Sequence, residues 1–382
     1  MRESAEAIVG RFEDAAAIAA ANADRAEREE RLTDSTVSAL LRAGVARLYL
    51  PAGLGGLEVD PLTCAAVTER IARADAAAGW FVMVANSAKI LAAGWPESLV
   101  AEVLGDDPDV VVAASGNRPF TGRPAGGDVI VSGVNSFVSG CHHARWLLST
   151  IVVDGEFLSV LLPMAECEIV DNWHALGMRG TGSNDVRADH VRVPAGHVVR
   201  MPTPGEVRRN RYYSSPLYLC PGRIVFATYV PVTLVLAERA IELLDELAEG
   251  KTPYAETSKL KHRSIAQIKA GRALATFRSG RALFREALAE TWDRARRGEE
   301  ASPQNRADLY LAGTHAVQSA ALVVRLVADA AGSSIIYRDN PLERIVRDME
   351  TLRHHGFVNE SRYGSVSQLR WGAELDYPLL LR

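Results

Sequence analysis

The hydrophobic periodicity of this 382-residue chain changes twice along its length. Residues 3–105 carry apolar side chains at three- and four-residue steps, as at Ile8, Phe12 and Ala16, which predicts amphipathic helices. Between Val110 and Val193, short β-branched runs are bounded by Gly, Pro and Asp, which predicts strands. Helical patterns then return from Pro216 onward. The chain is therefore expected to fold in the order helices, sheet, helices.

The expected strands cover residues 110–112, 129–131, 146–153, 157–162 and 191–193, and the expected long helices cover 222–249, 257–297, 304–331 and 341–372. The pair Asp60-Pro61 predicts a helix start, because an aspartate can cap the helix and proline suits its first position. We expect three domains: residues 1–108 helical, 109–212 β, and 213–382 a helical bundle.

Composition limits the class of protein. With 48% hydrophobic residues the chain can bury a large core, and a net charge of −4 without a long Lys/Arg run argues against a nucleic-acid or anionic-membrane surface. The sequence predicts no membrane-spanning stretch and no secretory signal, and hence a cytoplasmic protein. Four scattered cysteines are expected to be free thiols, and His142-His143, if on a strand, point apart, so we expect no metal site.

A glycine-rich segment lies between the expected strands 157–162 and 191–193. Residues 173–186 read Trp-His-Ala-Leu-Gly-Met-Arg-Gly-Thr-Gly-Ser-Asn-Asp-Val. Three glycines in six residues allow the backbone to approach a flat ligand, and Arg179, Thr181, Ser183 and Asn184 offer polar groups beside it. The same composition is also typical of a turn between two strands, and both interpretations stand on the local sequence.

Several further segments occur in a fixed order around this loop: Leu-Pro-Ala-Gly-Leu-Gly-Gly at 50–56, Ala-Asp-Ala-Ala-Ala-Gly-Trp at 74–80, Val-Ser-Gly-Val-Asn-Ser-Phe-Val-Ser-Gly at 131–140, Pro-Gly-Arg-Ile at 221–224 and Asn-Pro-Leu-Glu-Arg-Ile-Val-Arg-Asp at 340–348. With them the chain resembles the acyl-CoA dehydrogenase superfamily over essentially its full length. The resemblance implies an N-terminal α-helical domain, a central β-barrel-like domain and a C-terminal four-helix bundle.

Residues 136–146 and 331–337 look most like the two-component flavin-dependent monooxygenases of that superfamily, which hydroxylate aromatic compounds, thiophenes or amino groups. The dehydrogenases need a carboxylate base at one of two places. After Arg347-Asp348 this chain has His355 instead, and the segment before the Gly-Arg-Ile stretch carries Cys220 and no acid. A histidine suits an oxygenase that transfers protons near neutral pH and protects a flavin C4a-hydroperoxide from water. The alternative is an ordinary surface histidine, since His354 stands beside it.

The resemblance implies further roles. Ser139 matches a hydroxyl near flavin N5, with Phe137 against the ring, and Arg179, Thr181 and Ser183 are expected to bind the cofactor. Ser115 matches a serine that faces the substrate. Trp80, His143, Ser333 and Ser334 are expected to line the substrate pocket. For Ser139, Ser115 and Trp80 the pattern alone fits equally well with strand-end polar residues and a packing aromatic. Val134-Asn135-Ser136 departs from the Arg-Trp-x of many hydroxylases, so the substrate stays open.

No GxGxxG opens a helix after an expected strand, so the chain is not expected to bind NAD(P)H. We therefore predict a separate NAD(P)H:flavin reductase that supplies FMNH2 or FADH2, with O2 and a small molecule as co-substrates. The resemblance also implies a homotetramer formed through the bundle, although Ala-rich helices such as 266–289 are simply good helix formers as well. Two alternatives remain: an acyl-CoA dehydrogenase with an unrecognised base, and a flavin-free binding or scaffold protein.

Overall fold

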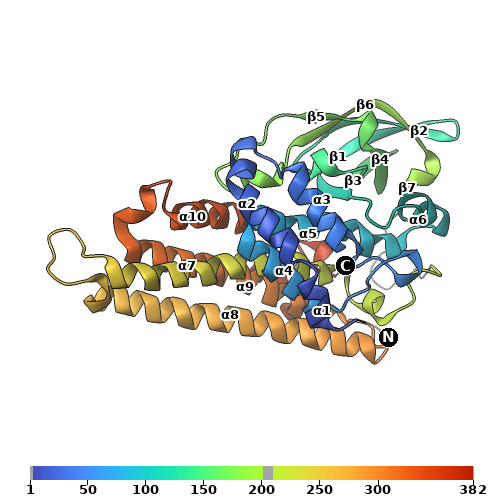
Figure 1. Ribbon diagram of the computed structural model, residues 1–382. Coiled ribbons are helices and arrows are strands. Elements are labelled where there is room, and N and C mark those ends of the chain that lie inside the picture. Colours follow the sequence, from blue (N-terminus) through green and yellow to red (C-terminus); the bar gives the residue numbers. More distant parts are fainter. Residues whose placement is uncertain (1–2, 201–209, 382) are drawn as a thin grey trace. The chain divides into compact units, whose positions relative to one another are not determined.

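The structure is a computed structural model that describes residues 3–200 and 210–381. The chain forms two compact units: residues 1–174 with 179–228, and residues 175–178 with 229–382. The described residues of the helical and β regions predicted for 1–108 and 109–212 lie in the first unit, apart from residues 175–178, and the helices and sheet of this unit are drawn in blue and green in Figure 1. The division into three domains stays a prediction.

The first unit begins with helices whose starts are capped by side chains. Asp60 accepts hydrogen bonds from the backbone N–H groups of Leu62 and Thr63, both at 3.0 Å, and Pro61 opens the helix, which confirms the predicted start. Thr33 and Asp75 cap two further helices in the same way. The α-helices of this region are α1 (Ala5–Gly10), α2 (Glu13–Glu29), α3 (Asp34–Ala43), α4 (Pro61–Ala74), α5 (Ala76–Leu91) and α6 (Glu97–Leu104).

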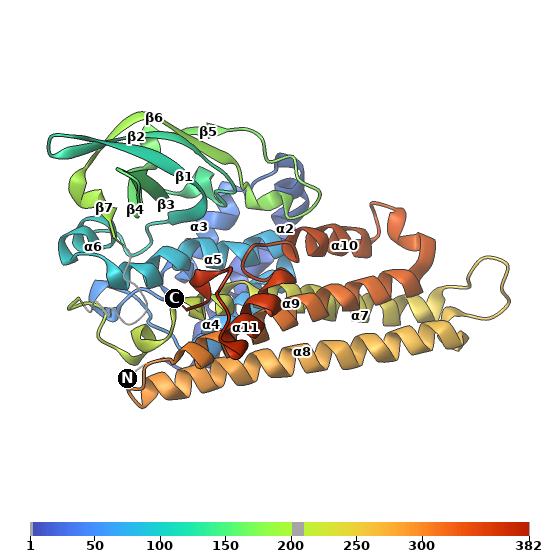
Figure 2. The same cartoon turned by 180° about the vertical axis from the view of Figure 1, so that it is seen from behind.

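A seven-stranded sheet completes the first unit, with the strand order β5-β6-β2-β1-β3-β4-β7. Among the strands of residues 3–200 and 210–381, only β1 and β3 pair in parallel. Strands β4 and β6 stand four places apart in this order, yet both contribute side chains to one apolar core. The sheet therefore curves around that core, as Figures 1 and 2 show. The strands are β1 (Val112–Ala125), β2 (Asp128–Asn135), β3 (Trp146–Val153), β4 (Glu156–Pro163), β5 (Glu168–Val170), β6 (Asp185–Pro194) and β7 (Val198–Val199).

Strand β1 is interrupted where it passes β3. Ser115 pairs with Ser149 and Phe120 with Ile151, so residues 116–119 stand opposite a single residue of β3. These four residues are exposed. The buried side chain of Asn135 closes the gap: its Nδ2 donates to the carbonyl of Arg118 at 2.8 Å and to the hydroxyl of Ser149. The strand predicted at 110–112 shares only Val112 with β1, and the bulge removes the alternation beyond Ser115.

Long antiparallel helices form the second unit. Gly280 of α8 faces Ala316 and Ser319 of α9 so closely that a Cβ on it would lie 2.9 Å from the Ser319 side chain. Such glycines allow two helix backbones to approach each other. Figure 2 shows α7, α8 and α9 running side by side. The α-helices are α7 (Val230–Gly250), α8 (Ser264–Arg296), α9 (Pro303–Ala331), α10 (Pro341–Leu352) and α11 (Ser361–Trp371).

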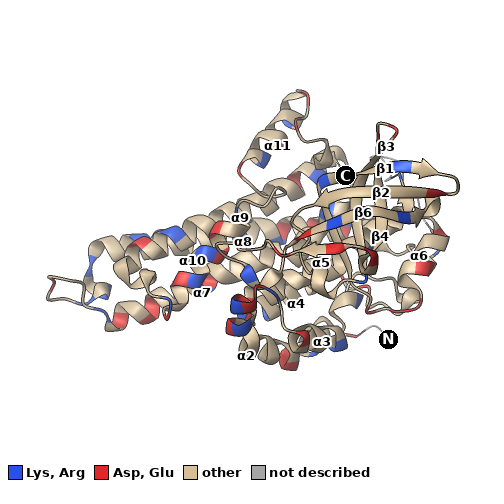
Figure 3. Ribbon diagram, turned by 90° about the horizontal axis from the view of Figure 1, so that it is seen from above, with Lys and Arg blue, Asp and Glu red and all other residues tan. Residues whose placement is uncertain are grey.

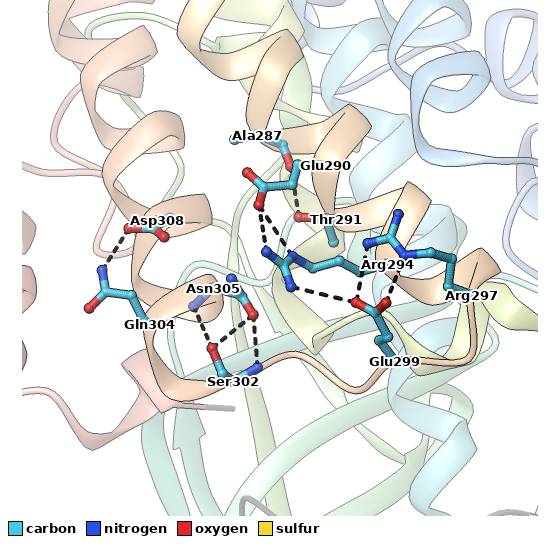
Figure 4. Close-up of polar contacts among 10 residues, drawn as sticks. All are labelled: Ala287, Glu290, Thr291, Arg294, Arg297, Glu299, Ser302, Gln304, Asn305 and Asp308. Carbon is cyan, nitrogen blue, oxygen red and sulfur yellow. Dashed lines mark hydrogen bonds and ion pairs between the residues drawn. The ribbon is translucent and has the colours of Figure 1, made fainter.

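The loop predicted near residues 297–304 connects α8 to α9, and Figure 4 shows the polar contacts that hold it. Ser302 and Asn305 form a reciprocal capping box at the start of α9. At the end of α8, the guanidinium of Arg297 binds Glu299 at 2.7 Å. The capping box satisfies the backbone N–H groups of Ser302 and Asn305, which a helix start leaves without partners.

Three predicted helices differ in the structure, and the one predicted over 257–297 begins only at Ser264, as α8. Residues 222–228 form a 3-10 turn, and α7 begins only at Val230, because Pro231 suits a first helical turn and not an interior. The helix predicted over 341–372 is broken into α10 and α11. His355 therefore lies in a turn, and the argument that placed it on a continuous helix was wrong. Hydrogen bonds from a distant side chain, described below, hold this turn.

The expectation that the chain has no stretch long and apolar enough for a membrane span was also wrong. Three segments meet that criterion by length and composition: Ala76–Gly94, Gly222–Gly250 and Pro303–Ile336. The apolar windows of the first two are 78% and 83% buried inside the protein, so their apolar side chains form core, while that of the third is 39% buried. Charged residues of both signs are interspersed along α2, α7 and α10, as Figure 3 shows.

Candidate active site

Two segments of the first unit are joined by backbone hydrogen bonds. Residues 137–143 follow β2, and residues 179–184 of the glycine-rich loop precede β6. The N–H of Gly140 donates to the carbonyl of Thr181, and the N–H of Val138 to that of Asn184, both at 3.0 Å. The Asn184 side chain adds contacts with His142 Nε2 at 3.2 Å and with the Val170 carbonyl at 3.1 Å. The two segments are thereby held as one local framework.

This framework brings three predicted hydroxyls together. The Ser139 Oγ lies 2.7 Å from the Ser183 Oγ, which lies 2.7 Å from Oγ1 of Thr181. The indole Nε1 of Trp80, on α5, donates to the Ser139 Oγ at 3.1 Å. Trp80 is buried, with 6% of its surface exposed. This contact orients Ser139, and the predicted role of Trp80 as a wall of the substrate pocket stays a prediction.

Phe137, two residues before Ser139, has an unusual backbone conformation and an exposed side chain. Its backbone φ is +59°, a left-handed conformation that costs energy for a residue with a Cβ, and its side chain is 59% exposed. The edge of the Trp173 ring meets it in a T-shaped contact with centroids 6.0 Å apart. An exposed aromatic held at a strained position next to buried hydroxyls is an apolar surface suited to a flat ligand.

The glycines of the loop are required by contacts with the protein itself. A Cβ on Gly177 would lie 2.2 Å from the Arg347 carbonyl oxygen of α10, which belongs to the same unit as residues 175–178. A Cβ on Gly180 would lie 3.0 Å from the Ala77 Cβ, and Gly182 has a φ of +54°. We predicted that these glycines allow a ligand to approach. The structure explains them by close packing of the loop on helices.

Arg179 has an acidic partner within the protein. Its guanidinium donates to Oε1 of Glu30 at 2.6 Å, and Nδ1 of His174 lies 2.7 Å from the other oxygen of the same carboxylate. Glu30 follows α2 in a left-handed conformation, with 18% of its side chain exposed. One carboxylate thus connects two points of the glycine-rich loop. The role of Arg179 in binding the cofactor stays a prediction.

Ser115 lies at the start of the β1 bulge, and its hydroxyl donates to the Ser136 carbonyl at 2.7 Å. Ser136 precedes Phe137, so this hydrogen bond connects Ser115 to the segment that carries the exposed ring. Its proposed contact with the substrate stays a prediction.

His142 and His143 lie in a 3-10 turn (Cys141–His143) and not on a strand, as we assumed. They nevertheless have separate partners: His142 contacts Asn184, while Nε2 of His143 lies 3.1 Å from the Leu32 carbonyl. Burial lowers the pKa of His143, although the Leu32 carbonyl opposes that shift. Among residues 3–200 and 210–381, no group of three His, Cys, Asp or Glu side chains is placed to hold a metal ion. The four cysteines are free thiols.

His355 belongs to the second unit, in the turn between α10 and α11. Its ring lies 5.7 Å from that of Tyr229 and 5.0 Å from that of Phe357, between centroids. Its Nδ1 accepts the N–H of Phe357 at 3.4 Å, which leaves Nε2 as the protonated nitrogen of the neutral ring. Gln318 of α9 donates to the carbonyls of Arg353 and Val358, at 3.1 and 2.9 Å, and so holds both ends of the turn.

Ser333 and Ser334 lie in the 3-10 turn Gly332–Ile336 that follows α9. The ammonium group of Lys251 donates to the Ser334 hydroxyl at 2.7 Å and to the Ala331 carbonyl at 2.5 Å. An open groove of about 660 Å³ within the second unit is lined by Ser334 and Tyr337, together with side chains of α7. Ser333 is exposed and does not line that groove.

The predicted residues thus form separate groups. Ser139, Ser183, Thr181 and Trp80 contact one another in the first unit, whereas His355 and Ser334 have their own neighbours in the second. Sequence reasoning did not assign a role to Trp173 or Gln318. Trp173 lies in the glycine-rich segment and could have been found there, but nothing local marks Gln318, whose partners lie 35 and 40 residues away.

Comparison with known proteins identifies the class. The family model described as acyl-CoA dehydrogenase, N-terminal domain, matches residues 3–98, and the acyl-CoA dehydrogenase C-terminal domain model matches residues 227–360. The chain belongs to the acyl-CoA dehydrogenase superfamily, as its ordered motifs and its helix, sheet, helix arrangement predict. Within that superfamily it belongs to the branch of flavin-dependent monooxygenase oxygenase subunits, as the following relatives show.

Indole-3-acetate monooxygenase of Pseudomonas putida is 29% identical over 356 residues, which cover 91% of this chain and 89% of that protein. The flavin-dependent monooxygenase oxygenase subunit HsaA of Rhodococcus jostii is 26% identical and covers 89% of this chain and 92% of its own length. The structure of XiaF from Streptomyces sp., in complex with FADH2 and glycerol, superposes with a TM-score of 0.89 at 24% identity, covering 97% of this chain and 96% of XiaF.

The residues of the framework fit a flavin, the cofactor of this class. The isoalloxazine of a flavin is flat and apolar on its faces and carries hydrogen-bonding atoms along its edge. Phe137 offers an exposed aromatic surface, and the half-buried Ser139, backed by the buried Ser183 and Thr181, offers a hydroxyl beside it. Both features match what a flavin ring requires.

Proposed function

We propose that this protein is the oxygenase component of a two-component flavin-dependent monooxygenase, which inserts one atom of O2 into an aromatic or amine substrate. Its cofactor is reduced flavin, FMNH2 or FADH2, delivered by a separate NAD(P)H:flavin reductase. When bound, the reduced flavin supplies the electrons that activate O2. The residues of this chain bind and orient the flavin and the substrate, exclude water and move protons.

One observation favours this proposal over a dehydrogenase: neither segment expected to hold a base presents a usable carboxylate. At the first, burial raises the pKa of the Cys220 thiol to about 12, so it stays protonated. At the second stands His355. The nearby Glu350 is ion-paired with Arg353, whose hydrogen bond lowers the pKa of that carboxyl and weakens it as a base. Removal of an α-proton next to a thioester therefore has no evident acceptor at either segment.

We assign Phe137 to contact with the flavin ring and Ser139 to a hydrogen bond with its edge. Ser183 and Thr181 hold the Ser139 hydroxyl in place, and Trp80 donates to it from the side of α5. Ser115, together with His143, Ser333 and Ser334, is proposed for the substrate side.

We assign proton transfer to His355. Because its Nδ1 accepts the Phe357 N–H, Nε2 is the nitrogen that would exchange a proton with the substrate or with the departing oxygen. His355→Gln keeps a polar group of similar size but cannot be protonated near neutral pH. We expect it to reduce kcat by about 10²- to 10⁴-fold, which is the usual contribution of general acid–base catalysis. The apparent pKa on the acid limb of the wild-type pH–rate profile should disappear with it.

Stopped-flow spectroscopy tests the function directly. The protein, loaded anaerobically with reduced FMN or FAD, is mixed with oxygenated buffer while the flavin spectrum is recorded. An absorbance transient that differs from reduced and oxidised flavin, and then decays to oxidised flavin, supports the oxygenase. Immediate reoxidation at the rate of free flavin, together with tight binding of oxidised FAD, would favour the dehydrogenase. Lack of affinity for either redox state would favour a flavin-free scaffold.

The need for a reductase is tested by mixing the pure protein with NADH and flavin. We expect negligible NADH oxidation until a flavin reductase is added. Enzymatic NADH oxidation by the protein alone would contradict the two-component arrangement.

We also propose a homotetramer assembled through the bundle. The outer side of α8 exposes large apolar side chains, with Ile265 and Ile268 each 57% and Leu283 37% exposed. Ile265 and Ile268 lie three residues apart and so are neighbours on the helix surface, and exposed apolar side chains that cluster in this way support an interface. Ile268→Glu should lower the mass measured by light scattering, whereas Arg278→Glu on the same helix serves as a charge control.

A cytoplasmic location is proposed as well and is tested by cell fractionation.

A further inference from the structure

The hydrogen bonds around Ser139 form one continuous chain: Trp80 Nε1, Ser139 Oγ, Ser183 Oγ and Thr181 Oγ1. The indole can only donate, so its contact has a fixed direction. In each of the two hydroxyl pairs, both 2.7 Å long, either oxygen can be the donor. Ser183 and Thr181 are 5% and 7% exposed, so water is a poor substitute for a lost partner.

A hydroxyl has one hydrogen and two acceptor sites, so this chain has two orientations in which the hydrogen of the buried Ser183 finds an acceptor within the chain. In the first, Thr181 donates to Ser183 and Ser183 donates to Ser139. Ser139 then accepts twice, and its own hydrogen is directed to a partner outside the chain. In the second, Ser139 donates to Ser183 and Ser183 donates to Thr181. Ser139 then keeps one acceptor site for an outside partner. Only hydroxyl hydrogens rotate between the two orientations.

A flavin presents the matching pair of states. The N5 atom of the oxidised ring is an acceptor, and two-electron reduction with addition of one proton turns it into an N–H donor. We propose that Ser183 and Thr181 are positioning residues that let the Ser139 hydroxyl reverse between donor and acceptor, so that it satisfies both redox states of the flavin. This inference rests on the proposed function, because it requires a flavin ring beside Ser139.

Ser183→Ala should therefore affect the two redox states unequally. With oxidised flavin, Ser139 still accepts from Trp80 and donates to the ring, and the Thr181 hydroxyl, which loses Ser183 as its acceptor, can direct its hydrogen away from the chain as it does in the second orientation. With reduced flavin, Ser139 accepts from both Trp80 and the ring, and its own hydrogen has lost Ser183 as acceptor. A buried donor without a partner is costly, whereas an unused acceptor site costs less. We expect the Kd of reduced flavin to rise about tenfold relative to that of oxidised flavin, which lowers the two-electron midpoint potential by about 30 mV.

Three further substitutions separate this effect from packing. Thr181→Val has the same shape but no hydroxyl, and it removes the acceptor for Ser183 in the orientation that reduced flavin needs. Thr181→Ser keeps the hydroxyl and loses only a methyl group, so it should preserve the wild-type ratio of affinities. Trp80→Phe removes the fixed donor but leaves both orientations of the hydroxyls satisfied. We expect it to change both affinities together and to leave their ratio unchanged.

The experiment is an anaerobic titration of the full-length wild type and the four variants with reduced and with oxidised FMN and FAD, followed by flavin absorbance and fluorescence. The readout is the ratio of the two Kd values, which does not require turnover. An increased ratio of reduced to oxidised Kd in Ser183→Ala and Thr181→Val, with a wild-type ratio in Thr181→Ser and Trp80→Phe, supports the proposal.

Equal loss of affinity for both redox states in Ser183→Ala and Thr181→Val would overturn it, because that result indicates packing alone. If Ser183→Ala does not fold, the pair at Thr181 decides the question on its own. If the wild type binds neither oxidised nor reduced flavin, the proposed function fails together with this inference. If the wild type binds reduced flavin and the variants have the same ratio of reduced to oxidised Kd as the wild type, the proposed reversal of the Ser139 hydroxyl is wrong and the proposed function stands.

Discussion

Lys89 gives the protein a pH-dependent stability that can be measured. Its side chain, on α5, is fully buried, and its ammonium donates to the Val110 carbonyl at 3.0 Å. Burial lowers its pKa from 10.5 to about 7, although the charges of Asp107 and Asp109 oppose that shift. Asp109 is itself paired with Arg47 at 2.5 Å, so part of its charge is already compensated.

The sign follows from proton binding. Above a pH of about 7 the folded protein releases the Lys89 proton, whereas the unfolded chain keeps it up to a pH of about 10.5. Unfolding therefore takes up a proton in this window, and stability rises with pH. Between a pH of about 7 and about 9.5 the site should contribute about 3 kcal/mol of added stability, which corresponds to roughly 6–12 °C in Tm for a unit of this size.

Lys89→Met keeps the length and apolar stem of the side chain but has no titratable group. Thermal unfolding of wild type and variant at the two pH values isolates the contribution of Lys89 to stability, since other groups titrate equally in both proteins. We expect the variant to be the more stable protein near neutral pH, by less than the full desolvation cost because the Val110 carbonyl loses a donor. An identical pH dependence of Tm in wild type and variant would refute the reasoning.

Three further predictions concern the loop and the turns. Gly177→Ala would place a Cβ 2.2 Å from the Arg347 carbonyl oxygen, and this overpacking should lower the free energy of unfolding by about 1–3 kcal/mol or more. As a control, Gly271→Ala meets nothing within 4 Å and should be neutral or stabilising. Thermal unfolding measures both variants. Gln318→Leu removes both hydrogen bonds to the turn of His355; we expect faster hydrogen exchange at residues 353–359 and lower kcat, and unchanged exchange there would contradict that role. Ser115→Ala should raise KM for the substrate without altering the Kd of reduced flavin, and a changed flavin Kd would assign Ser115 to the cofactor instead.

Local patterns predicted much of the fold. The start of α4 at Asp60-Pro61 and the strand Trp146–Val153 depend on residues close in sequence, and both were found. The turn at His355 was not predicted, because the apolar spacing of α10 continues into α11. The turn that separates these two helices is held by hydrogen bonds from Gln318, which lies on α9. Sequence periodicity contains no term for such a contact.

The site shows the same limit. The glycine-rich segment was identified, but its glycines could be explained only by neighbours such as Arg347, which is 170 residues from Gly177. Trp80 was predicted as part of the pocket wall, but its hydrogen bond to Ser139 was not predicted. Nothing in the sequence indicates that its indole donates to a residue 59 positions later. The hydroxyl chain likewise combines residues from three separate segments, and only the fold makes them neighbours.

The way Asn135 closes the bulge of β1 has a consequence for engineering. Because its amide supplies the cross-strand contacts, the paired parts of β1 on either side do not depend on the identity of residues 116–119, which are exposed. Because Asn135 binds the backbone carbonyl of Arg118, side-chain substitutions in this segment should leave the sheet intact, whereas deletions that move this carbonyl should not. The segment adjoins Ser115, so we expect libraries of varied side chains at 116–119 to reshape substrate preference while the framework that holds Ser139 stays as it is.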